Sequence, residues 1–210
     1  MKSKKLSPLA VYLVCAAAIV LLFAADQYTK SLAVQYLKDQ PSIELIPGVL
    51  ELFYLENHGM AFGLLQDQYW LFAVMTVLFL IVMVIVFYKL PKTRRFLPLF
   101  AVLTVLTAGA VGNFYDRFLN HYVVDFIYVS LINFPVFNVA DIYVTVSVAV
   151  FLLLYLLYYK DEDFAFLHKT PKRRSPMAEE ERILEVTPDF DGKRIDQCLA
   201  ASFSDCSRSF

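Results

Sequence analysis

Four aspartates of this chain lie inside or close to strongly apolar segments, where an ionisable side chain is costly. They are Asp26, Asp116, Asp125 and Asp141. A charged side chain within a membrane span costs roughly 2.5 to 3.5 kcal/mol on insertion scales, so each of the four is a candidate functional residue. Two carboxyl groups whose surroundings push their pKa values apart can act as general acid and general base on an amide bond.

Asp141 follows Asn138 by three residues at the start of an apolar run. Asn138 can cap a helix there, and Asp141 then takes the third helical position, where a carboxylate meets the positive end of the helix dipole. This position favours the ionised form of Asp141. A capping role and a catalytic role are both open for Asp141, and they are compatible with each other.

Asp125 is the only charged residue between Tyr122 and Ile127. Desolvation among bulky apolar neighbours should raise its pKa and favour the neutral acid. The alternative interpretation is an ordinary aspartate in a surface loop. If the first interpretation holds, Asp125 and Asp141 have the opposed environments that acid–base catalysis needs.

Asp26 and Asp116 are expected at the C-terminal ends of helices, where the helix dipole is unfavourable for an anion. Each should therefore have a cation as partner. Lys30 follows Asp26 by four residues, a good helical spacing, and Arg117 is available to Asp116 or to any neighbouring carboxylate. For both aspartates, ion pairing that locks the helices together is the favoured role.

The elements that must position these residues are apolar helices. The chain has 210 residues, of which 59% are hydrophobic and 16% aromatic, and its mean hydropathy is +0.55. A spanning helix needs roughly 20 mainly apolar residues, and four segments qualify: Leu9 to Ala25, Tyr69 to Tyr88, Phe96 to Tyr115, and Phe137 to Tyr159. We therefore predict an all-α membrane protein with four transmembrane helices, the first retained and not cleaved as a signal peptide. Gly109 and Gly112 should let helices approach closely.

Basic residues predict the orientation. Lys and Arg concentrate in residues 2–5, 89–95 and 160–174, whereas the other connections hold few. By the positive-inside rule both termini are cytoplasmic, and the four aspartates gather at the extracytoplasmic face. On that side, partial alternation around Pro47 and Gly48 predicts a hairpin in a small β element. The second outer segment, Phe118 to Phe134, is predicted to lie in the interfacial aromatic zone.

We divide the chain into a membrane domain, residues 1–160, and a charged, flexible cytoplasmic tail, residues 161–210. Three short segments near the end of the tail resemble the opening of the S4-type module found in some RNA pseudouridine synthases. They are Glu185 to Pro188, Asp191 to Asp196 and Ser207 to Ser209. About 30 residues are too few for that module to bury a core. We interpret this end as a truncated S4-like fragment left by a fused or read-through neighbouring gene, and we expect no nucleic acid to bind.

Five blocks of the chain, taken together and in order, resemble the lipoprotein signal peptidases, also called signal peptidase II. The resemblance covers roughly residues 8 to 160. The blocks are Asp26 to Lys30, Asn57 to Phe62, Gly109 to Arg117, Val123 to Phe126, and Phe137 to Asp141.

The resemblance implies an aspartic endopeptidase of the bacterial cytoplasmic (inner) membrane. Such an enzyme cuts signal peptides from prolipoproteins just before a cysteine that bears diacylglycerol, and the catalytic pair here would be Asp125 and Asp141. Residues expected to support the pair, the substrate or the fold are Asp26, Asn57, Asn113, Asp116, Arg117 and Asn138. We expect no metal and no cofactor, membrane lipid as a partner, and a monomer.

Other classes fit less well. A metalloprotease is disfavoured because His58, His121 and His168 are scattered and no HExxH sequence occurs. The main rival is a small transporter or ion-pathway protein, since membrane carboxylates also bind cations and relay protons. Such proteins usually place these residues near the midplane, and many have inverted repeats, which this chain lacks. A membrane scaffold subunit is a third possibility.

Overall fold

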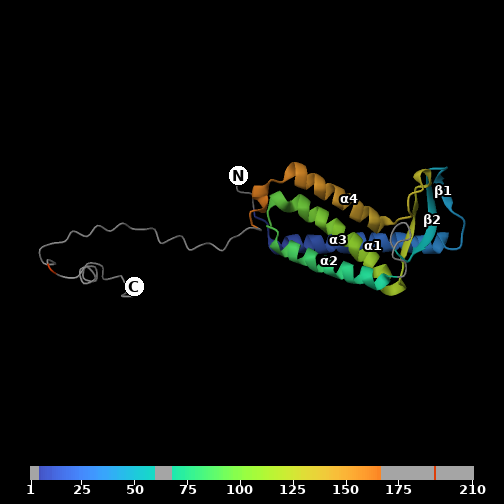
Figure 1. Cartoon of the computed structure of the whole chain (residues 1–210), viewed down its shortest axis with the longest axis horizontal. Coiled ribbons are helices and arrows are strands. Elements are labelled where there is room, and N and C mark those ends of the chain that lie inside the picture. Colours follow the sequence, from blue (N-terminus) through green and yellow to red (C-terminus); the bar gives the residue numbers. More distant parts are fainter. Residues whose placement is uncertain (1–4, 60–67, 167–191, 193–210) are drawn as a thin grey trace. The chain divides into compact units, whose positions relative to one another are not determined.

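The computed structural model describes residues 5–59, 68–166 and 192. The chain divides into two compact units, Met1–Lys160 and Asp161–Phe210. In the first unit, four long helices lie side by side with a small sheet at one end (Figure 1). The helices are α1 (Pro8–Leu37), α2 (Tyr69–Lys89), α3 (Leu97–Asn120) and α4 (Val139–Leu153). Together with the short turns that extend α3 and α4, each is long and apolar enough to cross a membrane, which confirms the four predicted spans.

In the second unit, the described residues include one short 3-10 helix, η5 (Asp161–Phe164). The S4-like segments that we quoted lie outside the described residues, apart from Gly192. The flexible character of the tail and its lack of RNA binding therefore stay predictions.

Helix α1 is much longer than the predicted span. It starts after the capping Ser7, with Pro8 at its first position, and has 30 residues. This corresponds to about 45 Å of helix, well beyond the roughly 30 Å of a bilayer core. The predicted end at Ala25 was wrong, because the following residues are too polar for a hydropathy window yet still form a helix. Asp26 thus lies in mid-helix, and the unfavourable end of the dipole does not act on it.

The sheet has three antiparallel strands in the order β1-β2-β3. Strands β1 (Ile43–Ile46) and β2 (Leu50–Asn57) form the predicted hairpin, and Gly48 takes the positive φ of 67° that its turn requires. Strand β3 (Val123–Tyr128) was not predicted as a strand. Its first four residues are all buried, so it lacks the alternation by which a half-buried strand is recognised in a sequence.

The sheet packs on the part of α1 that extends past the predicted span. Ala33 and Leu37, one helical turn apart, form a buried cluster with Val124 and Phe126 of β3. Partly buried apolar side chains from β2, β3 and the start of α4 surround this cluster. The extension of α1 therefore holds the strand that carries Asp125.

Helix α3 is the most enclosed of the four helices. In its most apolar stretch 56% of the residues are buried, against 6% to 11% in the other three helices. Its glycines make the close contacts that the sequence predicted. A Cβ atom on Gly109 would lie 2.6 Å from the carbonyl oxygen of Ala140, and one on Gly112 would lie 2.5 Å from Oδ2 of Asp26. Both distances are too short for a side chain, so the two glycines let α1 and the start of α4 approach α3.

The end of the bundle away from the sheet is basic and aromatic. The guanidinium of Arg95, in the short helix η2 (Arg94–Phe96), lies 4.0 Å from the ring centroid of Tyr158. Tyr158 ends η4 (Leu154–Tyr158), a π-helical turn that continues α4. The ammonium of Lys92 lies 5.1 Å from the ring of Tyr12. These cation–π contacts join η2 to the end of η4, and the connection before η2 to α1.

Candidate active site

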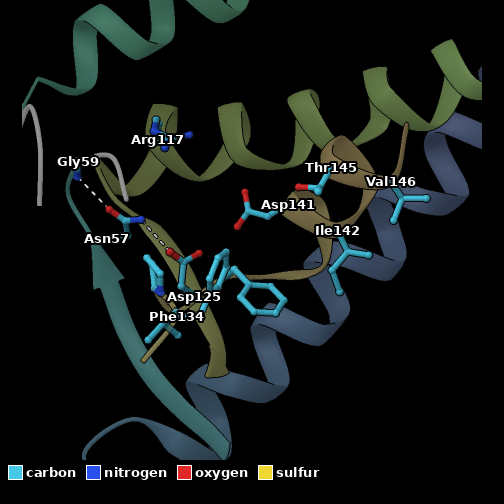
Figure 2. A pocket seen from close by; sticks show the side chains of 12 residues that line it. Asn57, Gly59, Arg117, Asp125, Phe134, Asp141, Ile142, Thr145 and Val146 are labelled. Atoms are coloured by element: carbon cyan, nitrogen blue, oxygen red, sulfur yellow. Dashed lines mark hydrogen bonds between the residues drawn. The ribbon is translucent and has the colours of Figure 1, made fainter. Parts of the chain in front are cut away.

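Asp125 is buried in the middle of β3, with 1% of its surface exposed, and both of its carboxyl oxygens accept hydrogen bonds. Asn57, the last residue of β2, donates from Nδ2 to Oδ2 of Asp125 at 2.8 Å (Figure 2). Asn138 donates from Nδ2 to Oδ1 of Asp125 at 2.6 Å. Sheet pairing and the start of α4 thus place one amide on each side of this carboxyl group.

Backbone donors determine how the two amides are oriented. Oδ1 of Asn57 accepts a hydrogen bond from the backbone N–H of Gly59 at 3.0 Å, drawn in Figure 2. Oδ1 of Asn138 accepts from the backbone N–H of Asp141 at 3.0 Å. Because each amide oxygen is engaged by a backbone donor, each amide nitrogen faces Asp125.

Asp141 occupies the third position of α4, as predicted. Its Oδ2 accepts from the backbone N–H of Asn138 at 3.0 Å, so the two residues form a complete capping box. Its Oδ1 accepts from Nδ2 of Asn113, on α3, at 2.8 Å. The capping role of Asp141 is therefore confirmed, and a second helix also holds its carboxyl group.

Asp26 and Asp116 share one cation. The Lys30 ammonium lies 2.9 Å from Oδ2 of Asp26 and 2.9 Å from Oδ2 of Asp116, and all three side chains are buried. The predicted pairing of Asp26 with Lys30 is confirmed, whereas Asp116 pairs with Lys30 and not with the adjacent Arg117. Asp26 also accepts from the backbone N–H of Ala140 at 2.9 Å, which fastens the start of α4 to α1.

Arg117 lies at the pocket that contains the two other aspartates. Its guanidinium lies 5.0 Å from the ring centroid of Phe72 on α2 and donates to the backbone oxygen of Asn113 at 3.3 Å. Arg117 therefore places a cation in the lining of a pocket whose other charged lining residues, Asp125 and Asp141, are carboxyls.

The electrostatics of Asp125 match the expectation from its sequence. Burial, and then the nearby charge of Asp141, raise the pKa of Asp125 from 3.8 to about 7, although the hydrogen bonds from Asn57 and Asn138 act in the opposite direction. A carboxyl group with such a pKa is present in both protonation states near neutral pH. It can therefore serve as the acid member of an acid–base pair.

The pocket joins this polar centre to an apolar wall, and its volume is about 420 Å³. Asp125 and Asp141 both line it, together with Phe134 and the first turns of α4 (Figure 2). Farther along α4 its lining includes Ile142 and Val146, which are 39% and 52% exposed on the surface of a membrane-spanning helix. The pocket thus reaches from the two carboxyl groups to a surface that faces lipid.

Comparison with known proteins identifies the family of this chain. The family model described as signal peptidase (SPase) II matches residues 18–157. The chain belongs to the signal peptidase II family. It is 40% identical over 146 residues to a lipoprotein signal peptidase of Streptococcus thermophilus, covering 70% of this chain and 92% of the relative. A lipoprotein signal peptidase of Streptococcus agalactiae is 39% identical over 129 residues, covering 61% and 82%.

The fold has solved counterparts as well. A structure described as a bacterial membrane enzyme is 31% identical to this signal peptidase, covers 76% of this chain and 99% of its own, and superposes with a TM-score of 0.63. Membership of a protease family decides against the transporter and scaffold interpretations, so the chain is a multi-pass membrane protease.

All eight predicted site residues fall in one region of this signal peptidase. The amides of Asn57 and Asn138 donate hydrogen bonds to Asp125, and the amide of Asn113 donates to Asp141. Arg117 lines the pocket, and Asp26 and Asp116 form the ion pairs with Lys30. The block from Asn57 to Phe62 is described only as far as Gly59, and its last three residues lie outside the described ones. Within residues 5–59, 68–166 and 192, no three His, Cys, Asp or Glu side chains gather as a metal site would require.

Sequence reasoning missed Gln27. Its Nε2 donates to Oδ1 of Asp116 at 3.0 Å, to Oδ2 of Asp26 at 3.2 Å and to the backbone oxygen of Gly112 at 3.4 Å. Gln27 thus supplies the second donor that the two carboxylates share. The sequence places Gln27 directly after Asp26, which could have suggested a role beside that carboxylate. Its partners on α3 could not be predicted, because they are 85 and 89 residues away in the sequence.

Proposed function

We propose that this signal peptidase removes signal peptides from diacylglyceryl-modified prolipoproteins by cutting just before the lipidated cysteine, and that Asp125 and Asp141 are its catalytic pair. The observation that carries the proposal is that these two carboxyl groups, from β3 and α4, line one pocket that extends to the lipid-facing surface. The lipoprotein signal peptidases to which the chain is similar support the substrate class.

In the proposed reaction, Asp141 is ionised and takes a proton from water as the water attacks the scissile carbonyl. Asp125 is protonated and hydrogen-bonds the developing oxyanion, and the two exchange roles when the amine leaves. The raised pKa of Asp125 and the position of Asp141 at a helix start support this assignment. Because the groups interact, the protons belong to the pair jointly. This chemistry uses no metal and no cofactor.

The apolar wall of the pocket fits the proposed substrate. A signal peptide and the acyl chains of a diacylglyceryl group reside within the bilayer, so they reach the site from the lipid side. Ile142 and Val146 line that approach, and Arg117 is available for a carbonyl of the extended peptide. Cleavage would then occur at the membrane surface, beside the sheet.

We further propose that both termini face the cytoplasm and that the site lies at the extracytoplasmic face of the bacterial cytoplasmic membrane. Lys92 and Arg95 lie among tyrosines at the end of the bundle opposite the sheet. By the positive-inside rule that end is cytoplasmic. The enzyme is proposed to act as a monomer, with its lipidated substrates and membrane lipid as partners.

The catalytic assignment is tested with Asp125→Asn and Asp141→Asn, each assayed for cleavage of a diacylglyceryl prolipoprotein. Because each carboxyl group is proposed to move a proton, kcat should fall by at least roughly 100-fold in each variant. The matched control is Asp39→Asn. Asp39 is exposed on the same side of the bundle, and its φ of 59° suits asparagine as well. Full cleavage by either catalytic-site variant, with normal amounts of protein in the membrane, would refute the pair.

A further inference from the structure

Lys30 uses all three of its N–H donors inside the protein. Besides the two carboxylates, its Nζ donates to Oδ1 of Asn113 at 3.0 Å. An ammonium group has three donors and no acceptor, and Lys30 is only 3% exposed. Neutralising Asp26 and Asp116 would occupy two of these donors, so the third contact needs a separate explanation.

The third contact determines the orientation of the Asn113 amide. Oδ1 of Asn113 accepts from Lys30 and also from Nδ2 of Asn138 at 3.1 Å. Its Nδ2 therefore faces Asp141 and donates to Oδ1 of that residue at 2.8 Å. With the amide reversed, its oxygen would face a carboxyl oxygen and its nitrogen would face an ammonium. A charge-assisted hydrogen bond in a buried site makes the observed orientation strongly preferred.

We propose that Lys30 is a positioning residue for proteolysis, acting through Asn113. By holding the oxygen of Asn113, Lys30 turns the amide nitrogen toward Asp141 and leaves the oxygen to accept from Asn138, which in turn holds Asp125. One ammonium group thereby orients the amide that donates to Asp141. Through Oδ1 of Asn113 it also provides an acceptor for the Asn138 amide that donates to Asp125. The inference rests on the proposed catalytic role of Asp125 and Asp141.

A double-mutant cycle tests the route of this effect. Lys30→Met, Asn113→Ala and the double variant are purified and assayed for kcat and KM on a diacylglyceryl prolipoprotein, and their melting temperatures are measured. Each single substitution should lower kcat by roughly 10- to 100-fold, because misplaced supporting groups cost this much, with KM changed less than about threefold. In the double variant kcat should equal that of Asn113→Ala, since residues that act through one another are not additive.

The result that would overturn the proposal is a double variant whose loss of kcat is the product of the two single losses. Lys30 would then act only on the fold. A large rise in KM with kcat unchanged would also overturn it. Failure of the catalytic assignment is recognised separately, by full cleavage in Asp141→Asn. If Asp141→Asn is inactive but the losses of kcat in the Lys30 and Asn113 variants multiply, the catalytic pair stands and only the role of Lys30 is refuted.

The cycle can also be run in a variant that already carries a second substitution, in case the Lys30→Met protein does not fold and accumulate in the membrane. Two carboxylates and one ammonium give this buried cluster one net negative charge, and Lys30→Met alone would leave two. Combining Lys30→Met with Asp116→Asn returns the cluster to one negative charge. The same cycle is then run with all four proteins carrying Asp116→Asn, and the same non-additivity is expected.

Discussion

Asn138 and Asp125 are joined by a hydrogen bond of 2.6 Å from Nδ2 to Oδ1, and they lie 13 residues apart in the sequence. The oxygen of the same Asn138 side chain caps α4 by accepting from the backbone N–H of Asp141. A single side chain therefore sets the start of the helix that carries one aspartate and contacts the carboxyl group of the other. The relative position of the two aspartates depends on it.

Asn138→Ser should separate these two roles. A serine oxygen can still cap α4, so the free energy of unfolding should change by less than about 1 kcal/mol through the cap. Serine does not replace the amide nitrogen that donates to Asp125, so kcat should fall by roughly 10-fold or more. The measurements are cleavage rate and thermal unfolding. Asn138→Ala serves as the comparison, because it loses the cap as well and should be less stable than Asn138→Ser. Equal activity of Asn138→Ser and wild type would contradict the role assigned to the amide.

The raised pKa of Asp125 predicts a pH-dependent stability. Its pKa is about 7 in the folded protein and about 3.8 in the unfolded chain, so the folded state binds the proton more tightly. The stabilisation is complete below about pH 4 and is lost as the pH rises through 7, a difference on the order of 4 kcal/mol. Unfolding of the wild type and of Asp125→Asn is measured from pH 4 to pH 8. The wild type should lose stability relative to the variant over this range, and identical pH profiles would contradict the prediction.

Leu37→Ala should displace Asp125 although Leu37 belongs to the apolar cluster under β3 and not to the pocket. Leu37 is 5% exposed and packs against Val124 and Phe126, the two neighbours of Asp125 in β3. Loss of this contact should cost about 2 to 5 kcal/mol of stability and lower kcat, because the strand is no longer held on α1. The control is Tyr36→Ala, at a neighbouring position that is 61% exposed. Both variants are compared in thermal unfolding and in cleavage, and similar behaviour of the two would count against the role of the cluster.

Local patterns predicted a large part of this fold. Hydropathy located the four spans, and the spacing of Asn138 and Asp141 predicted the capping box. The turn at Gly48 predicted the hairpin. Each of these features depends on residues that are close in the sequence, so the information is present in a short segment.

What was missed depends on contacts between distant segments. The extension of α1 past Ala25 is stabilised by β3, about 90 residues later, and the burial of β3 removes the alternation that would have revealed it. The bond from Lys30 to Asn113 spans 83 residues. Helical spacing could pair Lys30 with Asp26, but it could not show that the same ammonium also reaches α3.

The length of α1 also determines where the proposed catalytic pair stands relative to the bilayer. One continuous helix crosses the membrane and then carries the sheet on Ala33 and Leu37. Each residue added to that helix would raise the sheet by about 1.5 Å and rotate it by about 100°. The sheet would face α4 again only after about one full turn. The distance from the membrane to the proposed cleavage site can therefore change only in steps of roughly 5.4 Å, the rise of one helical turn of α1.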